Sequence, residues 1–496
     1  MLDADAVIVG SGAGGACVAD VLTRAGLSVV LLEEGPFVPA SHAPLTATAA
    51  FPLVWRCGGL TAALGKPPIA YAEGRCVGGG TEINSAIFQR VAPDLLDEWA
   101  GRYQIRDFDA GALTPWYERA AAVVNASLTP GPLGTPSDLL AKAGGMLGWK
   151  VAELERGQRS CVGTNMCSFV CPTAGKQSMS NTLLPQAVAR GLRLVAETRV
   201  DRFVLHRGRV TAAIGTAVDP AGRRVRIEAR GKLFFSCAGA IHTPALLHRS
   251  GFRHRVGRSL RLHPTLKCTA VFADPVDAHL HRLPLVAITE FMPDQRIGGS
   301  VFTPAIFALS LAEDWEKRRH LMPQWRNCAS YYAMVRPVGT GSINALPGCR
   351  EPIVRYALAP EDWAALGQAS AHLGEAMFAA GARLVIPSIT GHPGWRSPVE
   401  AREFLSTPLP RSKTNLMTIH LFSSCPPGEH PTLSATDSFG RVRRAENLFI
   451  ADGSAIPEAP GVNPQATIMA MSFRAAEAAL GISPSETARA AACEAA

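Results

Sequence analysis

The chain has 496 residues, of which 47% are hydrophobic and 18% are charged, enough apolar material for a large core in two interleaved domains. So low a charged fraction excludes long disordered segments, except in the Ala-rich tail over 483–496, which we expect to fray. The net charge of +8 comes from scattered arginines, which predicts a solvated surface and no nucleic-acid partner. No run of eighteen apolar residues and no signal peptide is found. We therefore expect a cytoplasmic protein without a transmembrane segment, with export alongside a partner subunit left open.

The first residues, 4–32, predict a dinucleotide-binding unit of strand, glycine-rich turn, helix and second strand. Gly10 permits the tight turn, Gly12 lets the backbone approach a pyrophosphate, and Gly15 allows the helix to pack closely on the strand. The helix N-terminus offers free N–H groups to the phosphates, and Glu33 can accept a hydrogen bond from a ribose hydroxyl. A glycine-rich turn without a ligand is the alternative, but it does not explain this order of elements. The cofactor candidates here are Gly10, Gly12, Ala13, Gly14, Gly15 and Glu33.

A second glycine-rich segment, over 74–84, lies too far downstream to belong to this unit. Its three consecutive glycines form a backbone surface that a flat ligand can approach closely. A flexible loop is the alternative, but the polar residues that flank the glycines would be odd choices for a loop alone. This segment adds Arg75, Gly79, Gly80 and Asn84 to the cofactor candidates.

At this segment the sequence resembles the glucose–methanol–choline (GMC) oxidoreductases, whose first signature lies along FAD. Later stretches resemble further blocks of that family in the same order, namely 239–251, 256–264, 447–454 and 461–467. The resemblance covers the whole chain. It implies an FAD-dependent enzyme that oxidises the CH–OH group of an alcohol to a carbonyl.

By that resemblance the fold is α/β, with a discontinuous Rossmann-like FAD-binding domain and an α+β substrate domain built on an antiparallel sheet. The FAD-binding domain would comprise 1–92, 192–262 and 422–496, and the substrate domain 93–191 and 263–421.

The residues themselves support this division. In the first domain they predict short apolar strands and a β-meander, at 193–196, 232–236, 447–451 and, for the meander, 200–227. In the second domain they predict a helix over 361–380 and a loop over 391–411.

Alcohol oxidation by a flavin needs a base for the hydroxyl proton, while the hydride passes from carbon to flavin N5, and a polar group that holds the oxygen. Histidine suits the base because its unperturbed pKa lies near neutral. The stretch 419–423 matches the family segment that carries the base, which makes His420 the catalytic candidate; a buried structural histidine is the alternative. The partner position falls on Asn463, as in the cholesterol-oxidase and long-chain-alcohol-oxidase branches.

The C-terminal block carries further candidates. Asn463 before Pro464 also predicts an ordinary helix start, with Asn at the N-cap and Pro at N1 of a helix over 464–480. This helix would aim its positive end at the flavin pyrimidine edge. The resemblance places Asp452 near the FAD pyrophosphate and ribityl chain and the backbone of Val200 near adenine, although a turn role for Asp452 stays open. The candidates are Val200, Asp452, Gly453, Asn463 and Pro464.

Three of the twelve cysteines, Cys161, Cys167 and Cys171, are spaced C-x5-C-x3-C in the segment 161–178 and could hold an iron–sulfur cluster. The spacing resembles the segment that binds a [3Fe-4S] cluster in FAD-dependent glucose and fructose dehydrogenases, which pass electrons to a cytochrome. The residues up to Ser178 resemble instead the long-chain alcohol oxidases, whose cysteines have no assigned cluster. Reduced structural thiols and a local disulfide stay open, and zinc ranks lower because a fourth ligand is not obvious.

The sequence therefore predicts an FAD-dependent alcohol dehydrogenase that passes electrons to a cytochrome or quinone, with a hydrophobic alcohol favoured over a sugar. Without the cluster, oxygen becomes a more plausible acceptor, as in an alcohol or sterol oxidase. A catalytically silent FAD-binding electron-transfer subunit is the alternative from another class, and the intact His420 and Asn463 argue against it. The motifs alone do not distinguish such an oxidoreductase from a lyase that has the same fold.

Overall fold

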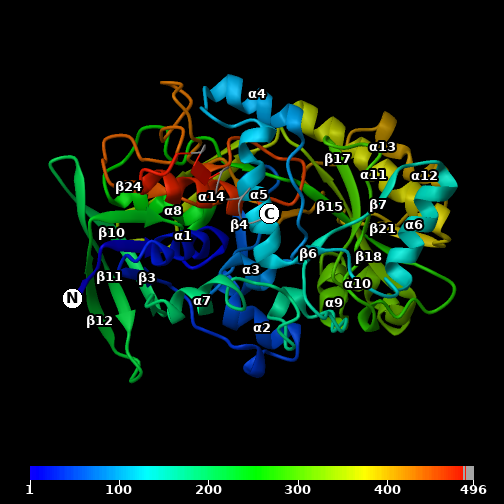
Figure 1. Cartoon of the computed structure of the whole chain (residues 1–496). Coiled ribbons are helices and arrows are strands. Elements are labelled where there is room, and N and C mark those ends of the chain that lie inside the picture. Colours follow the sequence, from blue (N-terminus) through cyan, green and yellow to red (C-terminus); the bar gives the residue numbers. More distant parts are fainter. Residues whose placement is uncertain (484–485, 488–496) are drawn as a thin grey trace.

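Two large sheets organise the part of the chain that the computed structural model describes, residues 1–483, 486 and 487. A five-stranded parallel sheet lies in one half of the molecule, and a nine-stranded mixed sheet lies in the other (Figure 1). The prediction of an α/β fold with a Rossmann-like domain and a substrate domain is confirmed. The predicted tail over 483–496 falls almost wholly outside the described residues.

The five-stranded sheet draws its strands from three distant parts of the chain. Their order across the sheet is β24 (Leu448–Ile450), β13 (Leu233–Ser236), β2 (Ala6–Val9), β3 (Val29–Leu32) and β9 (Arg193–Val195). Because helices cover both faces of such a sheet, the central strands are buried and read as continuous apolar runs. Each predicted strand is present, shorter by one or two residues.

Helices α1 (Ala13–Arg24) and α14 (Gln465–Ala479) pack against each other beside this sheet, and α8 (Gly239–Arg249) follows β13. The predicted β-meander is also present. It consists of β10 (Thr198–His206), β11 (Arg209–Val218) and β12 (Arg224–Arg230), and β1 (Leu2–Asp3) pairs with its last strand. The meander stands at the outer side of the parallel sheet (Figure 1).

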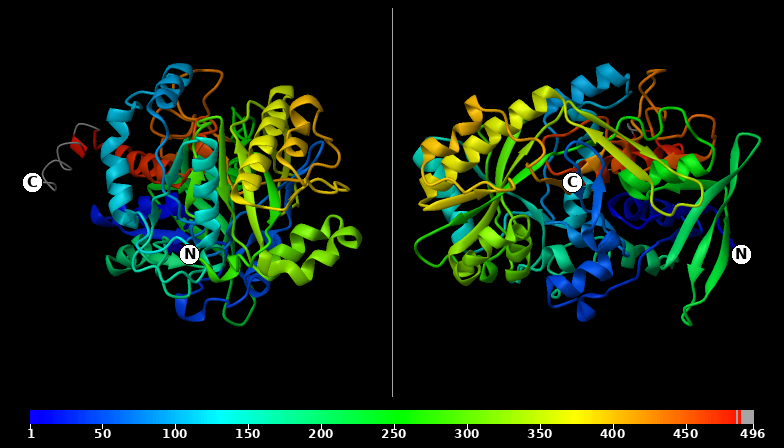
Figure 2. Two further views of the ribbon diagram at one scale, coloured as in Figure 1. Left: turned by 90° about the vertical axis from the view of Figure 1, so that its right-hand side faces the viewer. Right: turned by 180° about the vertical axis from the view of Figure 1, so that it is seen from behind.

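The nine-stranded sheet is mainly antiparallel, as predicted for the substrate domain. Its strands are β4 (Thr61–Ala63), β5 (Ile69–Tyr71), β22 (Leu416–Thr418), β15 (Thr265–Val271), β18 (Cys328–Val335), β17 (Gln295–Gly299), β16 (Val286–Ile288), β7 (Val151–Glu153) and β21 (Leu384–Pro387). The predicted helix over 361–380 is α11 (Pro360–Ala380), which packs with α6 (Thr135–Leu147) on the side of this sheet away from the other half (Figures 1 and 2). Strands β4 and β5 come from a stretch assigned to the other domain, and the domain limits stay a prediction.

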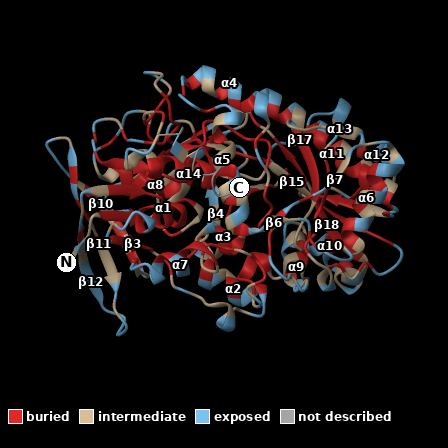
Figure 3. Ribbon diagram, viewed as in Figure 1, coloured by how far each residue is buried: buried red, intermediate tan, exposed pale blue. Residues whose placement is uncertain are grey.

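The remaining elements connect or cover these sheets, and Figure 3 shows that burial is concentrated in the strands and in the helices between the two halves. The helices are α2 (Ala47–Val54), α3 (Gly80–Ile83), α4 (Pro93–Tyr103), α5 (Ala110–Val124), α7 (Leu183–Ala189), α9 (Pro304–Ala312) and α10 (Trp315–Arg318). The short strands are β6 (Ala126–Ser127), β8 (Arg156–Gly157), β14 (Arg261–Leu262), β19 (Thr340–Asn344), β20 (Ile353–Ala357) and β23 (Leu421–Phe422). No helix in the described residues has both the length and the apolar composition to cross a bilayer.

Two sequence predictions need correction. The segment 391–411 is not all loop, because it contains the single-turn helices α12 (Pro398–Ala401) and α13 (Glu403–Ser406). The hydroxyl of Ser397 accepts a hydrogen bond from the N–H of Glu400, which starts α12 in spite of the Pro/Gly-rich composition. The last long helix has Pro464 rather than Asn463 at its N-cap position, so the side chain of Asn463 is free to turn elsewhere.

Candidate active site

One cleft gathers residues from every stretch in which the sequence placed a cofactor candidate. Its empty space, counted together with the open solvent at its mouth, is about 1590 Å³. Gly15 and Arg75 are the two candidates that do not line it. Those that do are Gly10, Gly12, Ala13, Gly14, Glu33, Gly79, Gly80, Asn84, Val200, Asp452, Gly453, Asn463 and Pro464, together with His420.

The first glycine turn is made of residues with different tasks. Gly10 has φ +101°, and a side chain there would overlap the carbonyl group of Cys237. A Cβ on Gly14 would overlap the carbonyl oxygen of Ala451, and one on Gly15 would overlap that of Gly10. These glycines are therefore required by backbone packing.

Gly12 differs from its neighbours because its missing side chain faces open space. The nearest atom to a Cβ built there is the Cα of Gly79, at 3.9 Å. Gly79 has φ +53°, and a Cβ on it would approach the Cα of Gly12 to 2.9 Å. The two glycine-rich segments thus meet backbone to backbone at the wall of the cleft, where the N-terminus of α1 opens.

The carboxylate of Glu33 is held firmly at the end of β3. Its oxygens accept hydrogen bonds from the N–H of Ser11 at 3.0 Å, the hydroxyl of Ser11 at 2.6 Å and the N–H of Gly35 at 2.8 Å. Burial raises the pKa of Glu33 in spite of these bonds. The structure therefore fixes the position of this acid at the cleft, and its contact with a ribose stays a prediction.

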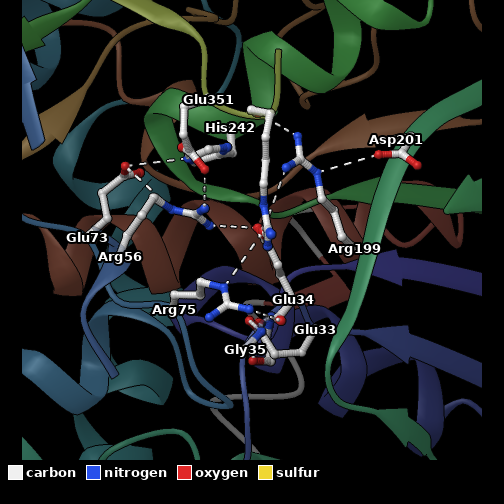
Figure 4. Close-up of polar contacts among 12 residues, drawn as sticks. Glu33, Glu34, Gly35, Arg56, Glu73, Arg75, Arg199, Asp201, His242 and Glu351 are labelled. Atoms are coloured by element: carbon white, nitrogen blue, oxygen red, sulfur yellow. Dashed lines mark hydrogen bonds and ion pairs between the residues drawn. The ribbon is translucent and has the colours of Figure 1, made fainter. Parts of the chain in front are cut away.

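Next to it, Glu34 is the centre of an ionic network that the sequence did not indicate (Figure 4). Its carboxylate is 2.8 Å from Arg56 and 2.5 Å from Arg350, with Arg75 at 3.8 Å and Arg199 at 4.0 Å. Burial would raise the pKa of Glu34, but the charge and hydrogen bond of Arg56 outweigh it and leave the pKa below the usual range.

The same network continues to a second pair of acids. Arg56 is 3.2 Å from Glu351 and 4.0 Å from Glu73. Nε2 of His242 lies 3.4 Å from Glu351 and 3.6 Å from Glu73 (Figure 4). Ionic contacts therefore tie the connection between β19 and β20, where Glu351 lies, to the end of the cleft that contains Val200.

The structure brings the two catalytic candidates together. His420 lies between β22 and β23 and is only 8% exposed, and its Nε2 is 3.0 Å from the side-chain amide of Asn463. Burial, with a smaller contribution from the positive charge of Arg296, lowers the pKa of His420 to about 3. The ring is therefore neutral over the ordinary pH range.

His263 stands behind this pair, and in the sequence it is marked only by its place in the family-like block 256–264. Its ring is fully buried, with Nδ1 3.0 Å from Nδ1 of His420 and Nε2 3.1 Å from the N–H of Gly461. Arg296, also buried, donates to the hydroxyl of Tyr332 at 2.8 Å. Both residues come from positions far from His420 in the chain, so no local pattern marks them.

Asp452 is a structural acceptor at the floor of the cleft. Its carboxylate accepts from the N–H of Gly239 at 2.9 Å, the hydroxyl of Thr243 at 2.5 Å and the N–H of Ser454 at 2.8 Å. These bonds join the start of α8 to the turn after β24. Burial raises the pKa of Asp452 although the hydrogen bonds favour its charged form.

The three clustered cysteines line a separate, smaller cavity. Nη2 of Arg156 lies 3.0 Å from Sγ of Cys167, and both residues are buried. Lys176, buried as well, lines the same cavity and donates to the carbonyl oxygen of Cys167 at 2.6 Å. In residues 1–483, 486 and 487 no three His, Cys, Asp or Glu side chains lie close enough together to hold a metal ion, which gives the zinc hypothesis no support.

Comparison with known proteins decides the family. GMC oxidoreductase family models match residues 5–265 and 343–472. The chain is 63% identical to the GMC-type oxidoreductase y4nJ of Sinorhizobium fredii, over 99% of this chain and 98% of that one. The chain belongs to the GMC oxidoreductase family.

More distant GMC relatives include the long-chain-alcohol oxidase FAO3 of Arabidopsis thaliana, 25% identical over 95% of this chain and 67% of that one. Among solved structures, pyridoxine 4-oxidase from Mesorbium loti shares the fold with a TM-score of 0.70 at 18% identity, over 96% of this chain and 98% of that one. GMC oxidoreductases depend on FAD. The cleft fits this group, because at Gly12 the absence of a side chain leaves backbone in its wall open to a phosphate.

Proposed function

We propose that this GMC oxidoreductase oxidises the CH–OH group of an alcohol to a carbonyl, with His420 as the proton acceptor. The observation that carries the proposal is the 3.0 Å contact between Nε2 of His420 and the amide of Asn463 in the wall of the glycine-lined cleft. An alcohol substrate is also supported by the distant relative named as a long-chain-alcohol oxidase. When bound, FAD would supply, at N5, the acceptor for the hydride that leaves the alcohol carbon.

His420 and Asn463 would have separate tasks. The ring of His420 is neutral, so it can take up the hydroxyl proton, and the amide of Asn463 can hold the hydroxyl oxygen in place. The cleft around them has an apolar lining, made of Ile83, Ile87, Ile419, Leu421 and Ile468. Ile419, next to the base, is 45% exposed. This lining supports a hydrophobic alcohol over a sugar.

The cofactor candidates would divide along the cleft. We propose that the pyrophosphate lies against the backbone of Gly12, where it meets Gly79 at the N-terminus of α1, with the adenosine toward Glu33 and Val200. The start of α14, at Pro464, would then face the flavin end. Arg75 would act indirectly, since it contacts Glu34 and not the cleft.

Two kinds of electron acceptor are compatible with this site. The sequence favoured a cytochrome or quinone, and that preference rested on the cysteine segment. Oxygen is supported by the relative and the structural neighbour that are named as oxidases. A silent electron-transfer subunit would not need a histidine and an amide in contact at the cleft.

Anaerobic mixing of the FAD-loaded enzyme with a panel of primary and secondary alcohols tests the proposal. Loss of the FAD absorbance on mixing reports turnover before any acceptor is added. Oxygen, a quinone or a cytochrome supplied afterwards then shows which one restores the absorbance. An enzyme that retains FAD but is bleached by no alcohol would be a silent subunit, and the proposal would be wrong.

We also propose that Cys161, Cys167 and Cys171 hold a [3Fe-4S] cluster, which when bound would carry electrons singly. Its support comes from the residues that line the cavity. Each thiolate of such a cluster binds a different iron, so the thiols need not meet at one point. The cavity is lined by all three cysteines and by the two buried cations, Arg156 and Lys176. One buried donor in its lining, Nε of Arg156, has no hydrogen-bond partner. The free space of the cavity is about 10 Å³, room for about one water molecule, so the thiols would have to move apart to admit a cluster.

A further inference from the structure

The rings of His263 and His420 meet edge to face in the wall of the cleft. Their Nδ1 atoms are 3.0 Å apart, and the ring planes are inclined by 86°. Burial holds the pKa of His263 well below its usual range, and His420 is neutral as well. A neutral imidazole carries one proton on one of its two nitrogens. One of the two Nδ1 atoms must therefore donate to the other.

The backbone decides which ring is the donor. The N–H of Gly461 lies 3.1 Å from Nε2 of His263, and a backbone amide can only donate. Nε2 of His263 must accept, so the proton of that ring is on Nδ1. This proton points at Nδ1 of His420, which must accept in turn. The proton of His420 is then left on Nε2.

The surroundings of the Asn463 amide are consistent with a proton on Nε2 of His420. Its Nδ2 is placed 3.0 Å from Nε2 of His420, and its Oδ1, which is buried, has no hydrogen-bond partner. The oxygen and nitrogen of a side-chain amide are assigned from their surroundings. With the amide turned over, Oδ1 accepts from the N–H of His420, and the unpaired oxygen gains its partner. With the protons instead on Nδ1 of His420 and Nε2 of His263, the ring N–H of His263 and the backbone N–H of Gly461 would face each other as two donors.

We infer that His263 is the positioning residue that fixes the proton of neutral His420 on Nε2. His420 then presents a donor, rather than a lone pair, to Asn463 and to a hydroxyl oxygen that reaches it. Before His420 can take up the hydroxyl proton, its own proton must move to Nδ1. His263 must then accept at Nδ1 and give up its bond with Gly461. The inference rests on the proposed function only for the identity of that hydroxyl.

Nitrogen NMR of the FAD-loaded enzyme, labelled with 15N-histidine, tests the inference, because protonated and unprotonated ring nitrogens resonate far apart. The signals of His420 are those missing from the spectrum of His420→Asn. We expect a proton on Nε2 of His420 and on Nδ1 of His263. A proton on Nδ1 of His420 would overturn the inference. No substrate is needed, so an enzyme that oxidises no alcohol contradicts the proposed function and leaves the NMR result standing.

Two variants of matched shape separate a positioning role from a packing role. In His263→Gln the amide oxygen can accept from Gly461 while the amide nitrogen donates to His420, so the proton of His420 should stay on Nε2. In His263→Glu, recorded at alkaline pH so that the carboxyl is ionised, both oxygens accept, and the proton should shift to Nδ1 of His420. An unshifted signal in the FAD-loaded Glu variant at that alkaline pH would show that His263 does not set the proton position. If neither variant folds, the wild-type spectrum alone decides.

Discussion

Gly12→Ala should separate cofactor binding from folding at the first glycine turn. Gly12 has φ −66° and ψ −166°, an extended conformation that alanine adopts without strain. The added methyl group would meet its nearest neighbour, the Cα of Gly79, at 3.9 Å, an ordinary contact distance. The FAD-free protein should therefore keep its free energy of unfolding to within about 0.5 kcal/mol. The methyl group would, however, occupy the space proposed for the pyrophosphate.

The expected loss of FAD affinity follows from the bonds displaced. A hydrogen bond between a backbone N–H and a charged phosphate oxygen contributes about 1.5–3 kcal/mol. If the methyl group at Gly12 displaces one such bond, FAD should bind about 10- to 150-fold more weakly. Titration of the FAD-free protein with FAD, followed by the change in flavin fluorescence, measures the dissociation constant directly.

Gly14→Ala is the matched control, because its added Cβ would overlap the carbonyl oxygen of Ala451. Overpacking of this kind should destabilise the FAD-free protein by about 1–3 kcal/mol or more, which thermal unfolding detects. Wild-type FAD affinity in Gly12→Ala would refute the placement of the pyrophosphate. An unfolding temperature lowered equally in both variants would refute the packing argument.

Three further predictions concern the rest of the site. His420→Ala should lower kcat by about two to four orders of magnitude while FAD stays bound, and an FAD-loaded variant with wild-type kcat would remove this residue as the base. Glu34→Gln should destabilise the protein by about 3 kcal/mol, because it leaves the surrounding arginines unpaired. Since the folded pKa of Glu34 lies below its usual 4.5, this contribution is present above that pH and is lost in stronger acid, so a difference in unfolding temperature that persists there would contradict it. Cys167→Ser should lose iron and an electron paramagnetic resonance signal that the anaerobically purified wild type shows; an iron-free wild type would end the cluster proposal.

The elements that the sequence predicts well are those with a strong local signal. Buried parallel strands such as β2 and β3 are recognised as apolar runs, and the glycines after β2 indicate where the strand ends and the helix begins. Short elements are predicted less well. The single turn of α12 depends on one capping hydroxyl, that of Ser397, which the Pro/Gly-rich composition does not indicate. The shift of the α14 N-cap from Asn463 to Pro464 is a change of one residue, yet it decides whether the Asn463 side chain serves the helix or the histidine.

The first glycine turn and Glu33 could be predicted from the residues themselves, but the catalytic pair could be predicted only from the family resemblance. It selected His420 and Asn463, which the fold places 3.0 Å apart. His263 and Glu34 were missed because their roles depend on contacts with residues far away in the chain. His263 meets Gly461, 198 positions later, and Glu34 meets Arg350, 316 positions later. A single sequence carries no periodicity at such separations, so these contacts become visible only in the folded chain.

Hydrogen bonds connect the cysteine cavity to the cleft. The site proposed to carry electrons is therefore in contact with the site proposed to bind the alcohol. Nζ of Lys176 donates to the carbonyl oxygens of Cys167 at 2.6 Å and of Asn84 at 3.3 Å. The side chain of Asn84 in turn donates to Gln465 at 2.6 Å, in the first turn of α14 and directly after the Asn463-Pro464 pair. Lys176 and Asn84 therefore form a continuous chain of hydrogen bonds from the cysteine cavity to the helix start that faces His420. If this chain couples the two sites, an occupant of the cavity should alter the proposed alcohol oxidation.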